Sequence, residues 1–78
     1  MVHLRIVVPA DLAQKVIELL CAAAAVTNVV HLRDAAHKPE GDLILCDVAR
    51  EDASLLIGDL KDLDVPSVGS IAVELTKR

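Results

Sequence analysis

Apolar residues recur at every second position at the start of the chain and then change to helical spacing. The alternation predicts a strand over residues 2–8 that ends before Pro9. Its inward side chains are Val2, Leu4, Ile6 and Val8. The spacing of three and four that follows predicts a helix over residues 11–24. The apolar stripe of this helix is Leu12, Val16, Leu19, Leu20 and Ala23.

Two strands are predicted in the middle of the chain. Residues 26–33 are rich in β-branched side chains, and residues 42–49 form a second apolar run. The polar segment 34–41 between them contains Pro39 and Gly41, which are typical of turns. We therefore predict that residues 34–41 form the connection between these two strands.

The last third of the chain repeats the order of helix and strand. Acidic residues open a predicted helix over residues 51–63, whose apolar stripe is Ala53, Leu56, Ile57, Leu60 and Leu63. Residues 64–67 are predicted as a loop. Residues 69–76 alternate and are predicted as the last strand, with the inward side chains Ile71, Val73 and Leu75.

The order strand, helix, strand, strand, helix, strand favours one α+β fold. Right-handed crossovers lead to a ferredoxin-like βαββαβ arrangement with an antiparallel sheet in the spatial order 4-1-3-2. Both helices then cover the same face of the sheet. The chain of 78 residues is long enough for one such domain, which we place at residues 1–78.

Helices on one side of a sheet leave its other face uncovered. Alternation assigns to this face the side chains His3, Arg5, Val7, Val29, His31, Arg33, Ala72, Glu74 and Thr76. Residues 42–49 are apolar on both sides, and burying Asp47 against the helices without a partner is costly. We therefore predict that Leu43, Leu45 and Asp47 lie on the uncovered face. With this choice, the side chains that face the helices are those of Ile44, Cys46 and Val48.

An apolar centre with a charged rim makes the uncovered face a candidate interface. The alternative is a solvated face on which Asp47 pairs with Arg5 or Arg33. Pairing of two such faces, or of strand edges, would give a homo-oligomer, with a dimer as the simplest case. The predicted interface or ligand-binding residues are Arg5, His31, Arg33, Leu43, Leu45 and Asp47.

Composition argues against two classes of partner. The chain has no Phe, Trp or Tyr on which bases could stack, and its net charge of −4 does not attract phosphate backbones. We therefore expect no nucleic-acid partner. No apolar run approaches the roughly 20 residues that span a bilayer, and the start lacks a signal-peptide pattern. These features lead us to expect a cytoplasmic domain.

Candidate chemistry is sparse. Cys21 and Cys46 are not spaced as a metal clip, and we expect the first to be inert and the second to lie in the core. His3 and His31 with Asp47 between them are the best candidates for a metal site, but a zinc site needs three or four convergent ligands. We therefore expect no metal, no cofactor, no catalytic residue and no enzymatic activity.

Four segments carry a family resemblance: residues 4–12 (LRIVVPADL), 26–33 (VTNVVHLR), 40–51 (EGDLILCDVARE) and 69–74 (GSIAVE). They resemble the N-terminal segment of an uncharacterised family of bacterial membrane proteins, domain of unknown function 389, especially its actinobacterial members. In that family the segment is a cytoplasmic domain that precedes a multi-helix hydrophobic region. The resemblance implies the head of a membrane protein and no assigned reaction.

The βαββαβ order also resembles ACT-type regulatory domains, which pair through their sheets and bind small effectors. We therefore expect a regulatory or assembly domain that self-associates and sets the oligomeric state of an attached membrane region. The alternative is an ACT-type sensor in which Arg5 and Arg33 hold an anionic small molecule.

Overall fold

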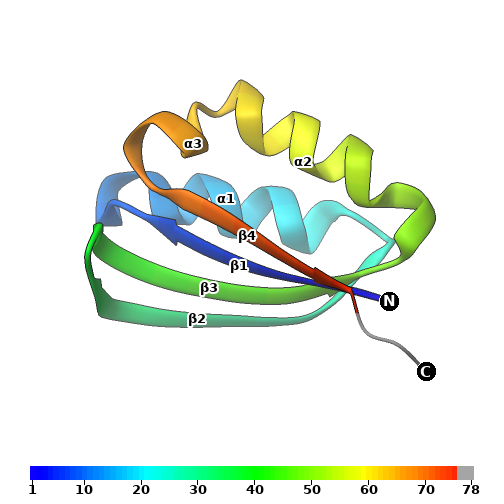
Figure 1. The fold of residues 1–78 in the computed structure, drawn as a ribbon, viewed down its shortest axis with the longest axis horizontal. Coiled ribbons are helices and arrows are strands. Elements are labelled where there is room, and N and C mark those ends of the chain that lie inside the picture. Colours follow the sequence, from blue (N-terminus) through cyan, green and yellow to red (C-terminus); the bar gives the residue numbers. More distant parts are fainter. Residues whose placement is uncertain (76–78) are drawn as a thin grey trace.

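Four strands form one antiparallel sheet in the computed structural model, which describes residues 1–75 (Figure 1). They are β1 (Val2–Val8), β2 (Val26–His37), β3 (Glu40–Val48) and β4 (Ser70–Leu75). The order across the sheet is β2-β3-β1-β4, and each neighbouring pair is antiparallel. The predicted ferredoxin-like α+β fold and its strand order are therefore confirmed.

The helices gather on one side of this sheet. Figure 1 shows α1 (Ala10–Ala22), α2 (Ala53–Asp62) and the short α3 (Val65–Val68) above the strands. A single 3₁₀ turn, η1 (Arg50–Asp52), leads into α2. None of the helices within residues 1–75 has the length and apolar composition needed to cross a lipid bilayer.

The core lies between the sheet and the helices, as the alternation predicts. Strands β1 and β3 each turn every second side chain into it, and those of β1 are at most 2% exposed. The helices contribute Ala13, Val16, Leu20, Leu56, Leu60 and Val65. Because apolar burial is worth about 25 cal/mol per Å², these shared contacts hold the two layers together.

The facing of β3 agrees with the prediction. Ile44, Cys46 and Val48 are at most 2% exposed and lie in the core. Leu43, Leu45 and Asp47 are half-buried and alternate with them, so they lie on the opposite face of the sheet.

Two predicted loops are wrong. Residues 34–41 do not form a connection, because β2 continues to His37 and β3 begins at Glu40, which leaves only Lys38 and Pro39 as the turn. The pairing of β2 with β3 is irregular near Asp34. The Asp34 backbone N–H donates to Asp42 Oδ1 at 2.9 Å, which stabilises this irregularity and allows the strand to continue past Asp34. The predicted loop 64–67 is partly the helix α3, whose first turn contains Pro66.

The predicted facing of β2 is also wrong from Val29 onward. Asn28 adopts a positive φ of 57°, and the pairing with β3 shifts between Thr27 and Val30. Such a bulge moves every later side chain to the opposite face. His31 therefore pairs with Ile44 on the helix side, and the uncovered face receives instead Val30 and Leu32.

Strand β4 closes the other edge of the sheet. Ile71 packs against the core, whereas Val73 and Leu75 on the same side are 52% and 56% exposed. The helix layer therefore covers only the start of this strand. Thr76, which we predicted on the uncovered face, lies outside the described residues.

Candidate functional site

One face of the sheet carries no covering element within residues 1–75, and we call it the open face (Figure 1). Its apolar side chains are Val7, Val30, Leu32, Leu43, Leu45 and Ala72. Its polar side chains include His3, Arg5, Asp47 and Glu74. The strand register puts these residues on one face because paired residues in an antiparallel ladder share a side.

The apolar part of the open face is larger than the sequence analysis predicted. Val30 and Leu32 are each 43% exposed, and they pair with Leu45 and Leu43 on the neighbouring strand. Val29, which we predicted at this place, packs instead against the core. The four apolar side chains of β2 and β3 therefore form one continuous patch.

Asp47 is held by two neighbours on the open face. Its carboxylate accepts a hydrogen bond from Asn28 Nδ2 at 2.8 Å and is also bonded to His3 Nδ1. These contacts, with the Asn28 bond the larger effect, lower the pKa of the Asp47 carboxyl from its ordinary value of 3.8. Asp47 is thus paired with His3 and Asn28, and not with either arginine of the alternative interpretation.

Arg5 and Glu74 are charged groups of the open face that have no ionic partner in the part of the chain that the structure describes. Neither takes part in an ion pair within residues 1–75, and both side chains are exposed. They lie on adjacent strands, since Arg5 pairs with Ala72 and His3 pairs with Glu74. Among the described residues, the open face therefore presents a positive and a negative group without an ionic partner beside its apolar patch.

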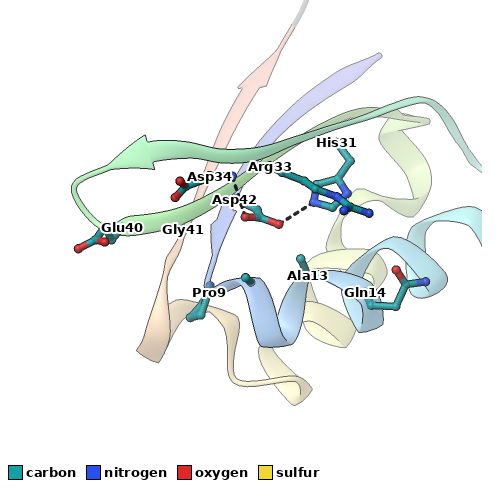
Figure 2. Close-up of a pocket in the computed structure, with 10 residues that line it drawn as sticks. Pro9, Ala13, Gln14, His31, Arg33, Asp34, Glu40, Gly41 and Asp42 are labelled. Carbon is teal, nitrogen blue, oxygen red and sulfur yellow. Dashed lines mark hydrogen bonds and ion pairs between the residues drawn. The ribbon is translucent and has the colours of Figure 1, made fainter.

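A second hollow lies on the helix side of the sheet, and we call it the hairpin pocket. It has a volume of about 500 Å³ and lies between the start of α1 and the β2–β3 hairpin. Its charged and titratable side chains are His31, Arg33, Asp34, Glu40 and Asp42. Figure 2 shows His31 and Arg33 reaching from β2 toward α1, with Asp42 beside them on β3.

Asp42 is the buried charge of the hairpin pocket, with 5% of its surface exposed. His31 Nε2 donates to Asp42 Oδ2 at 2.8 Å, and the Asp34 N–H satisfies the other oxygen (Figure 2). The Asp34 hydrogen bond first, and the His31 hydrogen bond second, lower the pKa of the Asp42 carboxyl from its ordinary value. Asp42 thereby fixes the orientation of the His31 ring.

The predicted site residues divide between the two faces. Arg5, Leu43, Leu45 and Asp47 lie together on the open face. His31 and Arg33 line the hairpin pocket on the opposite side. One small anion therefore cannot contact both Arg5 and Arg33, and His31 cannot join His3 and Asp47 around a metal.

Asp42 was not among the predicted site residues, although its position in the sequence carries a signal. Asp42 is two positions from Ile44 and therefore shares its inward side. A carboxylate at such a position requires a partner, because an unpaired buried charge is costly. A titratable residue on the neighbouring strand, His31, meets that requirement.

Other candidate chemistry is not assembled in the part of the chain that the structure describes. Residues 1–75 contain no group of three or more His, Cys, Asp or Glu side chains placed to hold a metal ion. Both cysteines are free: Cys21 is exposed, and Cys46 lies in the core as predicted. Burial, and secondly the nearby Asp47 charge, raises the pKa of the Cys46 thiol to about 11.

We expect acid to weaken the fold through Asp42 and Asp47. Both carboxyls have lowered pKa values in the folded chain, so their ionised forms stabilise it. This stabilisation is complete above the ordinary value of 3.8 and is lost as the pH falls through the lower folded values. Urea titrations between about pH 5 and about pH 2.5 should therefore show a steadily decreasing free energy of unfolding.

Variants separate this effect from general acid destabilisation. Asp42→Asn and Asp47→Asn, combined, should flatten the dependence of the free energy of unfolding on pH over that range. Asp59→Asn, an exposed substitution on α2, is the matched control and should leave the slope as in the unaltered chain. Equal slopes in all three proteins would contradict the expectation.

Comparisons of the chain with protein-family models, with curated proteins and with solved structures find no match. The function is therefore inferred from the geometry of the open face and of the hairpin pocket.

Proposed function

We propose that this chain is a non-enzymatic assembly domain that pairs with a second copy of itself through the open face. The observation that supports the proposal most directly is the continuous apolar patch of Val30, Leu32, Leu43 and Leu45. Contiguous apolar surface rimmed by charged groups is typical of interaction sites, because removing apolar surface from water lowers the free energy.

The charges of the open face favour a second copy as the occupant. Two-fold pairing brings the same surface together from both sides, so each group meets the other copy's surface. Arg5 and Glu74, which form no ion pair within residues 1–75, supply a cation and an anion for intermolecular ion pairs. A rim of one sign would instead repel its own copy.

The size of the open face indicates how strong the pairing is. Four strands about 4.8 Å apart, each presenting about six residues at about 3.3 Å, make a face of roughly 400 Å². Two such faces fall below the roughly 1,600 Å² of a standard interface. We therefore expect a dimer that dissociates on dilution, and not a permanent one.

The family resemblance supports a wider setting for this proposal. If the chain is the cytoplasmic head of a bacterial membrane protein, reversible pairing of heads would control how the attached membrane regions associate. Tethering beside a membrane raises the effective concentration of the heads, so a weak dimer is sufficient there. The regulatory role then consists of changing the fraction of paired heads.

The test of the proposal is the solution mass of the purified chain at several dilutions. Sedimentation velocity from about 1 μM to about 1 mM should pass from monomer to dimer. Moderate salt should weaken the dimer without abolishing it, because apolar burial dominates and only the rim is ionic. A chain that stays monomeric at every concentration would overturn the proposal, and assemblies larger than a dimer would indicate pairing through the edge strands.

A further inference from the structure

Besides Asp42, which is paired with His31, the hairpin pocket holds separated charges of both signs that no ion pair within residues 1–75 neutralises. We infer that the hairpin pocket binds a small amphoteric molecule, with a carboxylate held by Arg33 and an ammonium group held by Asp34 and Glu40. This site lies on the opposite side of the sheet from the open face, so the inference goes beyond the proposed function and does not depend on it.

The cationic end of the pocket is formed by Arg33 beside His31. Both side chains come from β2 and reach toward α1 (Figure 2). Arg33 is exposed and forms no ion pair with any residue of 1–75. Its guanidinium has five donors in a fork that matches the two oxygens of a carboxylate.

The acidic end is formed by the carboxylates of Asp34 and Glu40, near the turn of the hairpin. Figure 2 shows both of them toward that turn, away from the side chain of Arg33. Neither is in an ion pair within the described part of the chain. An ammonium group at this end would donate a charge-assisted hydrogen bond to a carboxylate and would lie in the field of both.

The charges in the hairpin pocket select against simpler ligands. An anion without a cationic group, bound beside Arg33, is repelled by the carboxylates of the pocket. The repulsion comes mainly from Asp34 and Glu40, because hydrogen bonds from His31 and a backbone N–H compensate the charge of Asp42. A cation without an anionic group, bound beside the carboxylates, is repelled by Arg33. Only a molecule that carries both groups avoids each repulsion, which is how unpaired charges produce specificity.

The walls of the pocket leave room for such a molecule. Pro9, Ala10 and Ala13 of the α1 side are small or short side chains opposite the polar strand residues. The volume of about 500 Å³ lies in the range that accommodates small ligands. The hydrogen bonds of Asp42 fix the ring of His31 without a ligand, so one wall of the site is preorganised.

The inference is tested with linear amino acids as probes, from glycine through β-alanine and γ-aminobutyrate to ε-aminocaproate. Amide proton–nitrogen correlation spectra of the full chain are recorded at constant ionic strength. We expect the shifts to be confined to residues lining the hairpin pocket, with one chain length binding best. That probe should bind at least about 10-fold more tightly than the alkyl carboxylate and the alkylamine of the same length.

Variants assign the two ends of the ligand. Arg33→Gln should remove the advantage over the amine, and Glu40→Gln should reduce the advantage over the carboxylate. Arg50→Gln and Glu51→Gln, both exposed on η1, are the matched controls and should bind as the unaltered chain does. Absence of shifts, equal binding of the bare carboxylate, or unchanged binding by Arg33→Gln would overturn the inference. Dimerisation is measured separately by sedimentation, so failure of the proposed function is distinguishable from failure of this site.

Discussion

Leu45→Asp should abolish self-association while leaving the fold intact. Leu45 lies at the centre of the open face, where it pairs with Arg5 on one side and Val30 on the other. Each dimer would lose two buried leucines and gain two carboxylates in its interface. Burial of one leucine side chain is worth about 1.5–3 kcal/mol, and desolvating a charge adds to the loss. Dimerisation should therefore weaken by at least about 100-fold.

The matched control is Leu55→Asp on the helix side. Leu55 lies on α2 with 70% of its surface exposed, so the same chemical change there removes little burial. Sedimentation velocity should show the Leu55→Asp chain dimerising like the unaltered one, and circular dichroism should show all three chains folded. If Leu45→Asp folds and still dimerises, the open face is not the interface. If it fails to fold, Val30→Asp tests the same patch on an edge strand.

The strands with a regular alternation could be predicted from the sequence because burial of one face determines their register. β1 turns four apolar side chains inward at every second position, and each one is almost fully buried. For β3, which is apolar on both sides, the polar residue Asp47 was enough to choose the face. The strand order then follows from the connections, since crossovers are right-handed.

The facing of β2 could not be predicted in the same way. Its register depends on Asn28, whose left-handed backbone inserts one residue into the ladder. Asn tolerates this conformation, but the sequence alone does not show whether it adopts it. A single such residue moved His31 and Arg33 from the open face to the hairpin pocket, and it moved Val30 and Leu32 in the opposite direction. The predicted faces of these residues were therefore wrong because of one backbone conformation, and not because the wrong residue types were chosen.

Gly69→Ala should destabilise the chain strongly. Gly69 joins α3 to β4, and its N–H donates to the Val65 carbonyl oxygen at 2.8 Å. A Cβ at this position would overlap the carbonyl oxygen of Val7, a backbone atom of the central strand β1. Because backbone cannot rotate away as a side chain can, β4 must separate from β1 where Ser70 pairs with Val7. The free energy of unfolding should fall by about 3 kcal/mol or more.

Gly58→Ala is the matched control, since it adds the same methyl group at an exposed position inside α2. A Cβ at Gly58 would have no neighbouring atom within 4 Å, so the substitution causes no overlap. It should raise the free energy of unfolding by about 1 kcal/mol, because alanine favours a helix interior more than glycine does. Urea unfolding of both variants measures the difference in sign. Equal stability of Gly69→Ala and the unaltered chain would mean that β4 does not pack against β1 at this point, and the open face would then lose its fourth strand.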